Sequence, residues 1–120
     1  MATIKLGARP KSIKHTVSFP MLDGTQGQIA CEFKYRTRRE FGEFIEKMTA
    51  DIKPVEGTAA IHAAQVEQSA KYLGEVLEGW DLEHKLNHDS LVQLVDELPA
   101  AANAILDAYR GAIIEGRLGN

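Results

Sequence analysis

Two stretches of alternating apolar and polar residues near the amino terminus constrain the fold of this chain most strongly. They span residues 12–19 and 28–36, and a turn-forming segment with Asp23-Gly24 separates them. A two-residue period is typical of a strand with one buried face. The two stretches therefore predict an antiparallel β-hairpin. The positions on its apolar face are Ile13, His15, Val17, Phe19, Ile29, Cys31, Phe33 and Tyr35.

The pairing of these strands follows from the requirement that their apolar faces coincide. A two-residue turn at Asp23-Gly24 would put the apolar residues on opposite faces. We therefore expect an odd-length loop or a bulge, with Gly27 as the natural place for the bulge. This register pairs Phe19 with Ile29.

The opposite face of the predicted hairpin carries basic residues. In the expected register Lys14 lies against Lys34, and Ser12 lies beside Arg36, so like charges oppose the pairing. An isolated hairpin is marginally stable, so helices should cover its apolar face. Residues 3–6 have the composition of a short third strand.

Four helices are predicted after the hairpin. The first begins at a capping box formed by Thr37 and Glu40, and it ends before Pro54. The second covers about residues 58–78, and Gly79 stops it. Asp89 or Ser90 can cap a third, short helix. Pro99 suits the first position of the fourth. The fold class is α+β, with the hairpin segregated from the helices.

Length and charge limit the organisation of the chain. Its 120 residues suit a single domain over 1–120, with a hairpin region (1–36) and a helical region (37–120). Residues 1–39 have eight basic and two acidic side chains, whereas residues 40–120 have six basic and fifteen acidic ones. The basic part can either bind an acidic partner or be neutralised by the acidic part of its own chain.

Signals of catalysis or of cofactor binding are weak throughout. His84 and His88 have the spacing of a helical metal pair, but the segment reads as a loop and lacks the other residues of a zinc motif. The single cysteine, Cys31, lies on the apolar face and reads as a small buried side chain. No phosphate-binding glycine motif is present. We therefore predict no enzyme activity, no catalytic residues, no metal and no cofactor.

Short motifs along nearly the whole chain resemble the tail assembly chaperones of long-tailed bacteriophages and prophages. The resemblance depends on the order and spacing of the motifs. They are Arg9-Pro10-Lys11, Val17, Leu22-Asp23-Gly24, Phe33 to Arg38 followed by Glu40, Gly79-Trp80-Asp81, Leu98-Pro99-Ala100-Ala101, Ile105, Tyr109 and Arg117 to Asn120.

The resemblance implies a non-enzymatic helper in tail morphogenesis. Such a protein binds the tape measure protein, keeps it soluble in the cytoplasm of the bacterial host, and is absent from the mature virion. The family often makes a longer, frameshifted product that recruits the tail tube protein, and this chain would be the short product. No membrane partner is expected, and a homo-oligomer is compatible with the open edges of a hairpin.

The candidate partner-binding residues form an apolar set and a basic set. An apolar groove with a polar rim suits an amphipathic helix of the client. The alternative for the apolar set, Trp80 above all, is a place in the core. The basic set supports a runner-up function as a nucleic-acid-associated module, although the acidic chain disfavours it, and a third alternative is a small structural virion protein. The candidates are Trp80, Leu91, Leu94, Leu98 and Tyr109 (apolar) and Lys34, Arg36, Arg38 and Arg39 (basic).

Overall fold

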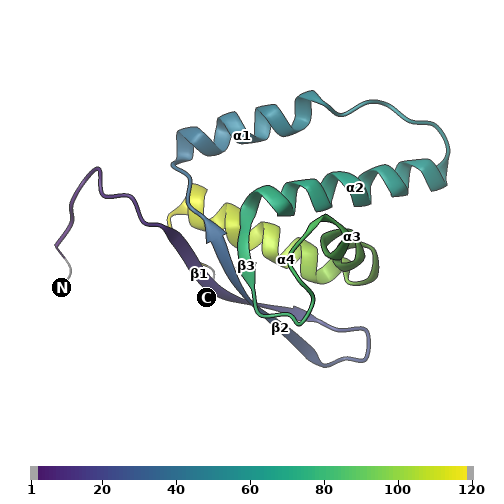
Figure 1. Cartoon of the computed structure of the whole chain (residues 1–120), viewed down its shortest axis with the longest axis horizontal. Coiled ribbons are helices and arrows are strands. Elements are labelled where there is room, and N and C mark those ends of the chain that lie inside the picture. Colours follow the sequence, from purple (N-terminus) through teal and green to yellow (C-terminus); the bar gives the residue numbers. More distant parts are fainter. Residues whose placement is uncertain (1–2, 119–120) are drawn as a thin grey trace.

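The computed structural model describes residues 3–118 and contains a three-stranded antiparallel sheet with helices packed on one face (Figure 1). The predicted α+β class with four α-helices is confirmed. In chain order the elements are β1 (Ser12–Pro20), β2 (Gln26–Lys34), α1 (Arg38–Ala50), α2 (Thr58–Val76), β3 (Leu77–Trp80), α3 (His88–Glu97), α4 (Pro99–Arg110) and a short π-helical turn η1 (Gly111–Glu115).

The hairpin forms as predicted, but its register differs by two residues. Val17 pairs with Ile29 and Phe19 pairs with Gly27, so the apolar residues still share one face. The predicted odd-length loop is confirmed, because residues 21–25 connect the strands. Asp23 accepts hydrogen bonds from both the backbone N–H and the hydroxyl of Thr25, which closes this loop tightly.

The expected clash of like charges is wrong because of this register. Lys14 lies opposite Glu32, and Ser12 lies opposite Lys34. The hydroxyl of Ser12 also donates a hydrogen bond of 3.0 Å to the Glu32 carboxylate. The solvent face of the hairpin therefore carries opposite charges side by side, which favours the pairing.

Gly27 forms no bulge, contrary to the prediction, but its lack of a side chain matters. A Cβ at this position would lie 2.6 Å from the ring of Phe19 and 2.8 Å from the sulfur of Met21. Phe19 is buried in the core and cannot move aside freely. Gly27 therefore provides the space that the Phe19 ring fills.

We expect Gly27→Ala to lower the free energy of unfolding by about 1–3 kcal/mol, the usual cost of overpacking. Gly42→Ala is the matched control, because Gly42 lies in α1 with nothing within 4 Å of its would-be Cβ. The control should stabilise the protein by roughly 0.5–1 kcal/mol, since alanine favours a helix interior. Urea unfolding monitored by circular dichroism measures both. Equal effects of the two substitutions would contradict the packing argument.

The third strand is β3 and not residues 3–6, so that prediction is wrong. Helix α2 ends at Val76, earlier than expected, and Leu77 takes up an extended conformation. The following residues pair with β2, with Trp80 opposite Cys31. The Asp81 carboxylate then accepts a hydrogen bond of 2.9 Å from the backbone N–H of Ala30. β3 was missed because four residues with one glycine show no two-residue alternation.

The helix boundaries otherwise follow the predicted caps. Thr37 and Glu40 form the expected capping box of α1. The predicted cap of α3, Asp89 or Ser90, is wrong: the cap is Asn87, two residues before Asp89, and Ser90 is its capping-box partner. Pro99 occupies the first turn of α4, as expected. Within the described residues no helix is both long enough and apolar enough to cross a membrane.

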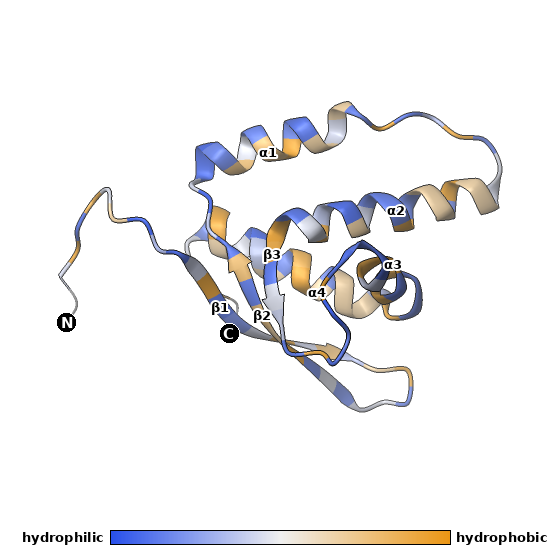
Figure 2. Cartoon of the chain, viewed as in Figure 1, coloured by the Kyte–Doolittle hydropathy of each residue, from blue (hydrophilic) through white to orange (hydrophobic). Residues whose placement is uncertain are grey.

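The core lies between the sheet and the helices. Hydrophobic positions alternate with polar ones along the helices, as Figure 2 shows. The largest fully buried side chains are Tyr109, Phe33, Ile29, Leu73, Ile105 and Val76. The core thus joins β2 to α2 and α4, and α3, next to the loop that follows β3, adds Leu91, Leu94 and Val95 to it from one side of the molecule.

Candidate functional site

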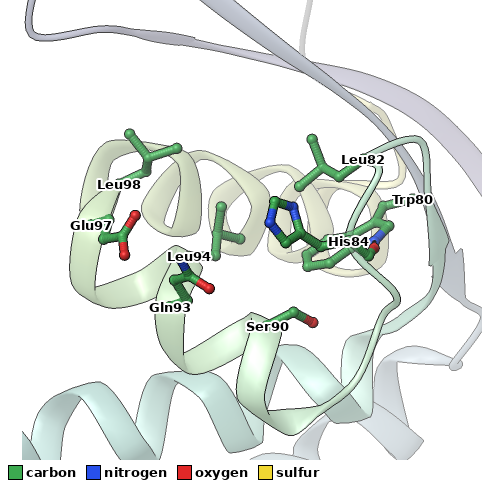
Figure 3. Close-up of a pocket in the computed structure, with 8 residues that line it drawn as sticks. All are labelled: Trp80, Leu82, His84, Ser90, Gln93, Leu94, Glu97 and Leu98. Atoms are coloured by element: carbon green, nitrogen blue, oxygen red, sulfur yellow. The ribbon is translucent and has the colours of Figure 1, made fainter.

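A small apolar groove lies between α3 and the loop that follows β3 (Figure 3). Leu94 forms its middle, with Leu98 on one side and Leu82, His84 and Trp80 on the other. Its volume is about 180 Å³. This is smaller than the roughly 300–1,000 Å³ of typical small-molecule pockets, so the groove suits one or two inserted side chains. The polar lining residues are His84, Ser90, Gln93 and Glu97.

Hydrogen bonds within the chain hold the loop wall of this groove in place. The indole N–H of Trp80 donates to the carbonyl oxygen of His84 at 2.8 Å. The hydroxyl of Ser90 donates to the carbonyl oxygen of Lys85 at 2.6 Å, and Asn87 caps α3. Because Asp81 is also bonded to β2, both ends of the loop are fixed to regular structure. The groove is therefore largely formed before any partner arrives.

The segment that forms the groove is acidic, and Glu97 is the carboxylate that lines the groove itself. Between residues 81 and 97 there are five exposed carboxylates and one exposed lysine. The carboxylates belong to Asp81, Glu83, Asp89, Asp96 and Glu97, and the lysine is Lys85. An apolar floor with an acidic surround fits a partner segment that has apolar residues flanked by basic ones.

The structure brings together three of the five apolar residues predicted to bind a partner. Trp80 and Leu98 are half-buried, Leu94 is a buried core residue at 6% exposure, and all three line the groove. Leu91 and Tyr109 are only 3% and 0% exposed and belong to the core. Helix α4, which carries Tyr109, contributes no lining residue, and the loop after β3 forms the second wall. Leu82 and His84 lie in this wall, and they were overlooked because a loop has no periodicity to reveal them.

The four predicted basic residues do not act as one group. Lys34, Arg38 and Arg39 are exposed. The Arg36 side chain is only 12% exposed and points inward, where it donates hydrogen bonds to the Tyr109 hydroxyl at 2.9 Å and to the Glu75 carbonyl oxygen at 3.0 Å. Its guanidinium also lies 4.0 Å from the centroid of the Phe44 ring. Arg36 therefore contributes to the packing of the interior and not to the exposed basic surface.

The charge asymmetry of the chain is partly neutralised internally. Arg9 forms an ion pair of 2.7 Å with Glu40, and the Arg36 guanidinium lies 4.0 Å from the Glu75 carboxylate. Both pairs join the basic amino-terminal part to the acidic helical part. The basic part was expected either to bind an acidic partner or to be neutralised by the acidic part of its own chain. Arg9 and Arg36 are neutralised within the chain.

The two histidines with metal-like spacing do not share a helix. His84 lies in the loop before α3, and His88 is the first residue of α3. The Nε2 atom of His88 lies 2.9 Å from a carboxylate oxygen of Glu67. No cluster of three potential metal ligands is found between residues 3 and 118.

Comparison with known proteins identifies the family. No curated protein and no solved structure gives a match to this chain. A family model described as phage tail assembly chaperone matches residues 1–120. The match covers the whole chain and agrees with the resemblance seen in the sequence, so the chain belongs to the phage tail assembly chaperone family.

Proposed function

We propose that this chain binds the tape measure protein and keeps it soluble in the host cytoplasm while the phage tail assembles. The observation that carries the proposal is the preformed apolar groove between α3 and the β3–α3 loop. A chaperone of this kind needs a surface that shields apolar residues of its client, and it needs no catalytic group. A frameshifted longer form that recruits the tail tube protein, and absence from the finished virion, are parts of the same proposal.

The groove supports a particular class of client segment. Its size suits the insertion of one or two apolar side chains from an amphipathic helix, in the helix-in-groove mode of recognition. The acidic surround favours a helix whose polar face is basic near the inserted residue. Most of the binding energy would come from the apolar contact, since exposed charges are screened by salt.

The test is co-expression of this chain with the tape measure protein of the same phage. Wild-type chain, captured through a tag, should bring the tape measure protein with it in soluble form, and the complex should persist at high salt. Leu82→Glu places a charge in the groove and should reduce the captured client roughly tenfold or more, equivalent to about 1.4 kcal/mol of binding free energy. A tape measure protein that stays insoluble beside wild-type chain would refute the proposal.

Leu22→Glu is the matched control for this experiment. Leu22 is fully exposed at the hairpin tip, so the control makes the same chemical change away from the groove. It should leave capture unchanged. Thermal unfolding of each variant checks that the fold is intact, and Leu82→Ala gives a milder variant. Equal capture by the Leu82 and Leu22 variants would exclude the groove as the binding site.

A further inference from the structure

The amino-terminal arm, residues 3–11, extends away from the sheet (Figure 1), and two of its apolar side chains are exposed. Ile4 is 86% exposed and Leu6 is 96% exposed. They alternate with Thr3 and Lys5, which is the pattern of a strand. Within the described residues, however, this segment pairs with no strand. An exposed strand-like segment of this kind is a candidate for pairing with another chain.

The free edge of β1 offers a place for such a segment. β1 is an edge strand, and within the described part of the chain it pairs only with β2. A groove of about 510 Å³ is lined by four consecutive β1 residues, His15 to Ser18. The side chains of consecutive strand residues point to opposite faces of the sheet, so a groove that contacts all four runs along the outer edge of β1. The opposite wall comes from α4 and the following turn. Ala104, Asp107, Ala108, Gly111, Glu115 and Arg117 line this wall.

The arm and this groove match in length, polarity and charge. Residues 3–6 and residues 15–18 each span roughly 13 Å as extended chain. The groove offers Ala104 and Ala108 to the apolar side chains of the arm, and it offers the carboxylate of Asp107 to its charges. Glu115 also lines the groove, but its carboxylate lies 3.9 Å from the guanidinium of Arg117, another lining residue. Residues 3–11 contain three basic residues and no acidic one. No proline, lysine, arginine or acidic residue lies between residues 15 and 18, so this part of the edge lacks the residue types that usually protect an edge strand from strand addition.

The arm of the same chain is held away from this edge. Arg9 forms its ion pair with Glu40, and its guanidinium lies 5.0 Å from the centroid of the Tyr35 ring. Tyr35 and Glu40 follow β2 in the chain, so these contacts draw the base of the arm toward β2 and away from the outer edge of β1. The same contacts in a second copy keep the arm of that copy off its own β1, but they do not keep it from the β1 edge of the first copy.

We infer that residues 3–6 of one copy add as a strand to the outer edge of β1 in a second copy. The chain therefore self-associates through its arm, beside the α4 wall and apart from the groove proposed for the client. This inference is independent of the client groove, because self-association can be measured without any tape measure protein.

Sedimentation velocity over a range of protein concentrations tests the inference. Wild-type chain should self-associate as its concentration rises. The double variant Ile4→Asp/Leu6→Asp should remain monomeric, and it should fold normally because both side chains are exposed. The control Leu22→Asp changes an equally exposed leucine at the hairpin tip and should associate like wild type. A wild-type chain that stays monomeric, or a double variant that associates equally well, would overturn the inference.

Crosslinking then identifies which arm occupies the edge. A Leu6→Cys variant is mixed with a Thr16→Cys variant and treated with a short bis-maleimide. Cys31 is buried and should not react. A crosslinked heterodimer is expected. Crosslinks that form only within one chain of a Leu6→Cys/Thr16→Cys variant would show that each arm folds onto its own edge, and they would refute exchange between copies.

Discussion

Replacing Tyr109 by alanine is expected to lower the free energy of unfolding by about 4 kcal/mol, the largest effect of any single substitution considered. Tyr109 is fully buried in α4. Its ring centroid lies 5.5 Å from that of Phe33 and 5.9 Å from that of Phe41. The substitution removes these contacts, leaves a cavity, and takes one hydrogen-bond acceptor from Arg36. Since a domain has only about 5–15 kcal/mol of stability, much of the protein should be unfolded at moderate urea concentrations.

Two further variants separate the contributions to this loss. Tyr109→Phe keeps the ring and removes only the hydroxyl, so it should cost about 1.5–3 kcal/mol, the value of a hydrogen bond to a charged group. Tyr35→Ala removes a half-exposed tyrosine outside the core cluster and should cost much less than Tyr109→Ala. Urea unfolding monitored by far-ultraviolet circular dichroism measures all three. If Tyr109→Ala and Tyr35→Ala had similar costs, the central role of Tyr109 would be wrong.

The environment of Tyr109 also affects how the basic residues should be studied. A variant that removes all four basic residues of the candidate set would lose Arg36, which bridges the Tyr109 hydroxyl and the end of α2. Loss of client binding in that variant would then reflect loss of the fold. Replacing only Lys34, Arg38 and Arg39, which are exposed, tests the surface charge without disturbing the core.

The parts of the fold that the sequence predicted correctly are those specified by local patterns. The two-residue alternation located the hairpin, and the Thr37–Glu40 capping box and Pro99 located the starts of α1 and α4. The exact register depended on the five-residue loop, whose hydrogen bonds to Asp23 no alternation reveals. β3 depended on a partner strand more than forty residues away, and therefore on tertiary pairing alone.

The candidate site was predictable in part for the same reason. Leu94 and Leu98 lie on one face of a periodic helix, and Trp80 is the only tryptophan of the chain. These features of the sequence were enough to predict the three residues as candidates for the groove. Leu82 and His84 enter the groove only because the loop is tied to β2 through Asp81 and closed by the Trp80 indole. The inward direction of the Arg36 side chain could not be predicted either. Arg36 lies in a basic segment whose other residues are exposed or half-exposed, and no pattern in the sequence distinguishes it from them.

The other large effect concerns Cys31, the only cysteine of the chain. Its side chain is 3% exposed, opposite Trp80 in the sheet. Burial, with a smaller effect of the nearby Asp81 carboxylate, raises the pKa of the thiol from 9.0 to about 12. Because only the thiolate reacts with alkylating agents, a pKa of about 12 in place of 9.0 lowers the reactive fraction at pH 8 about a thousandfold. Native protein should therefore react with iodoacetamide at least that much more slowly than unfolded protein.

Mass spectrometry of timed samples measures this rate, with urea-unfolded protein as the reference. The same shift gives stability a defined pH dependence. Between pH 9 and 12 the unfolded thiol loses its proton while the native thiol keeps it, so the unfolded state binds fewer protons and the free energy of unfolding falls as the pH rises. A Cys31→Ala variant should lack this part of the decline. If native Cys31 reacted as fast as the unfolded thiol at pH 8, the sheet would have to open between β2 and β3, and the wall of the groove that begins at Trp80 would not be preformed.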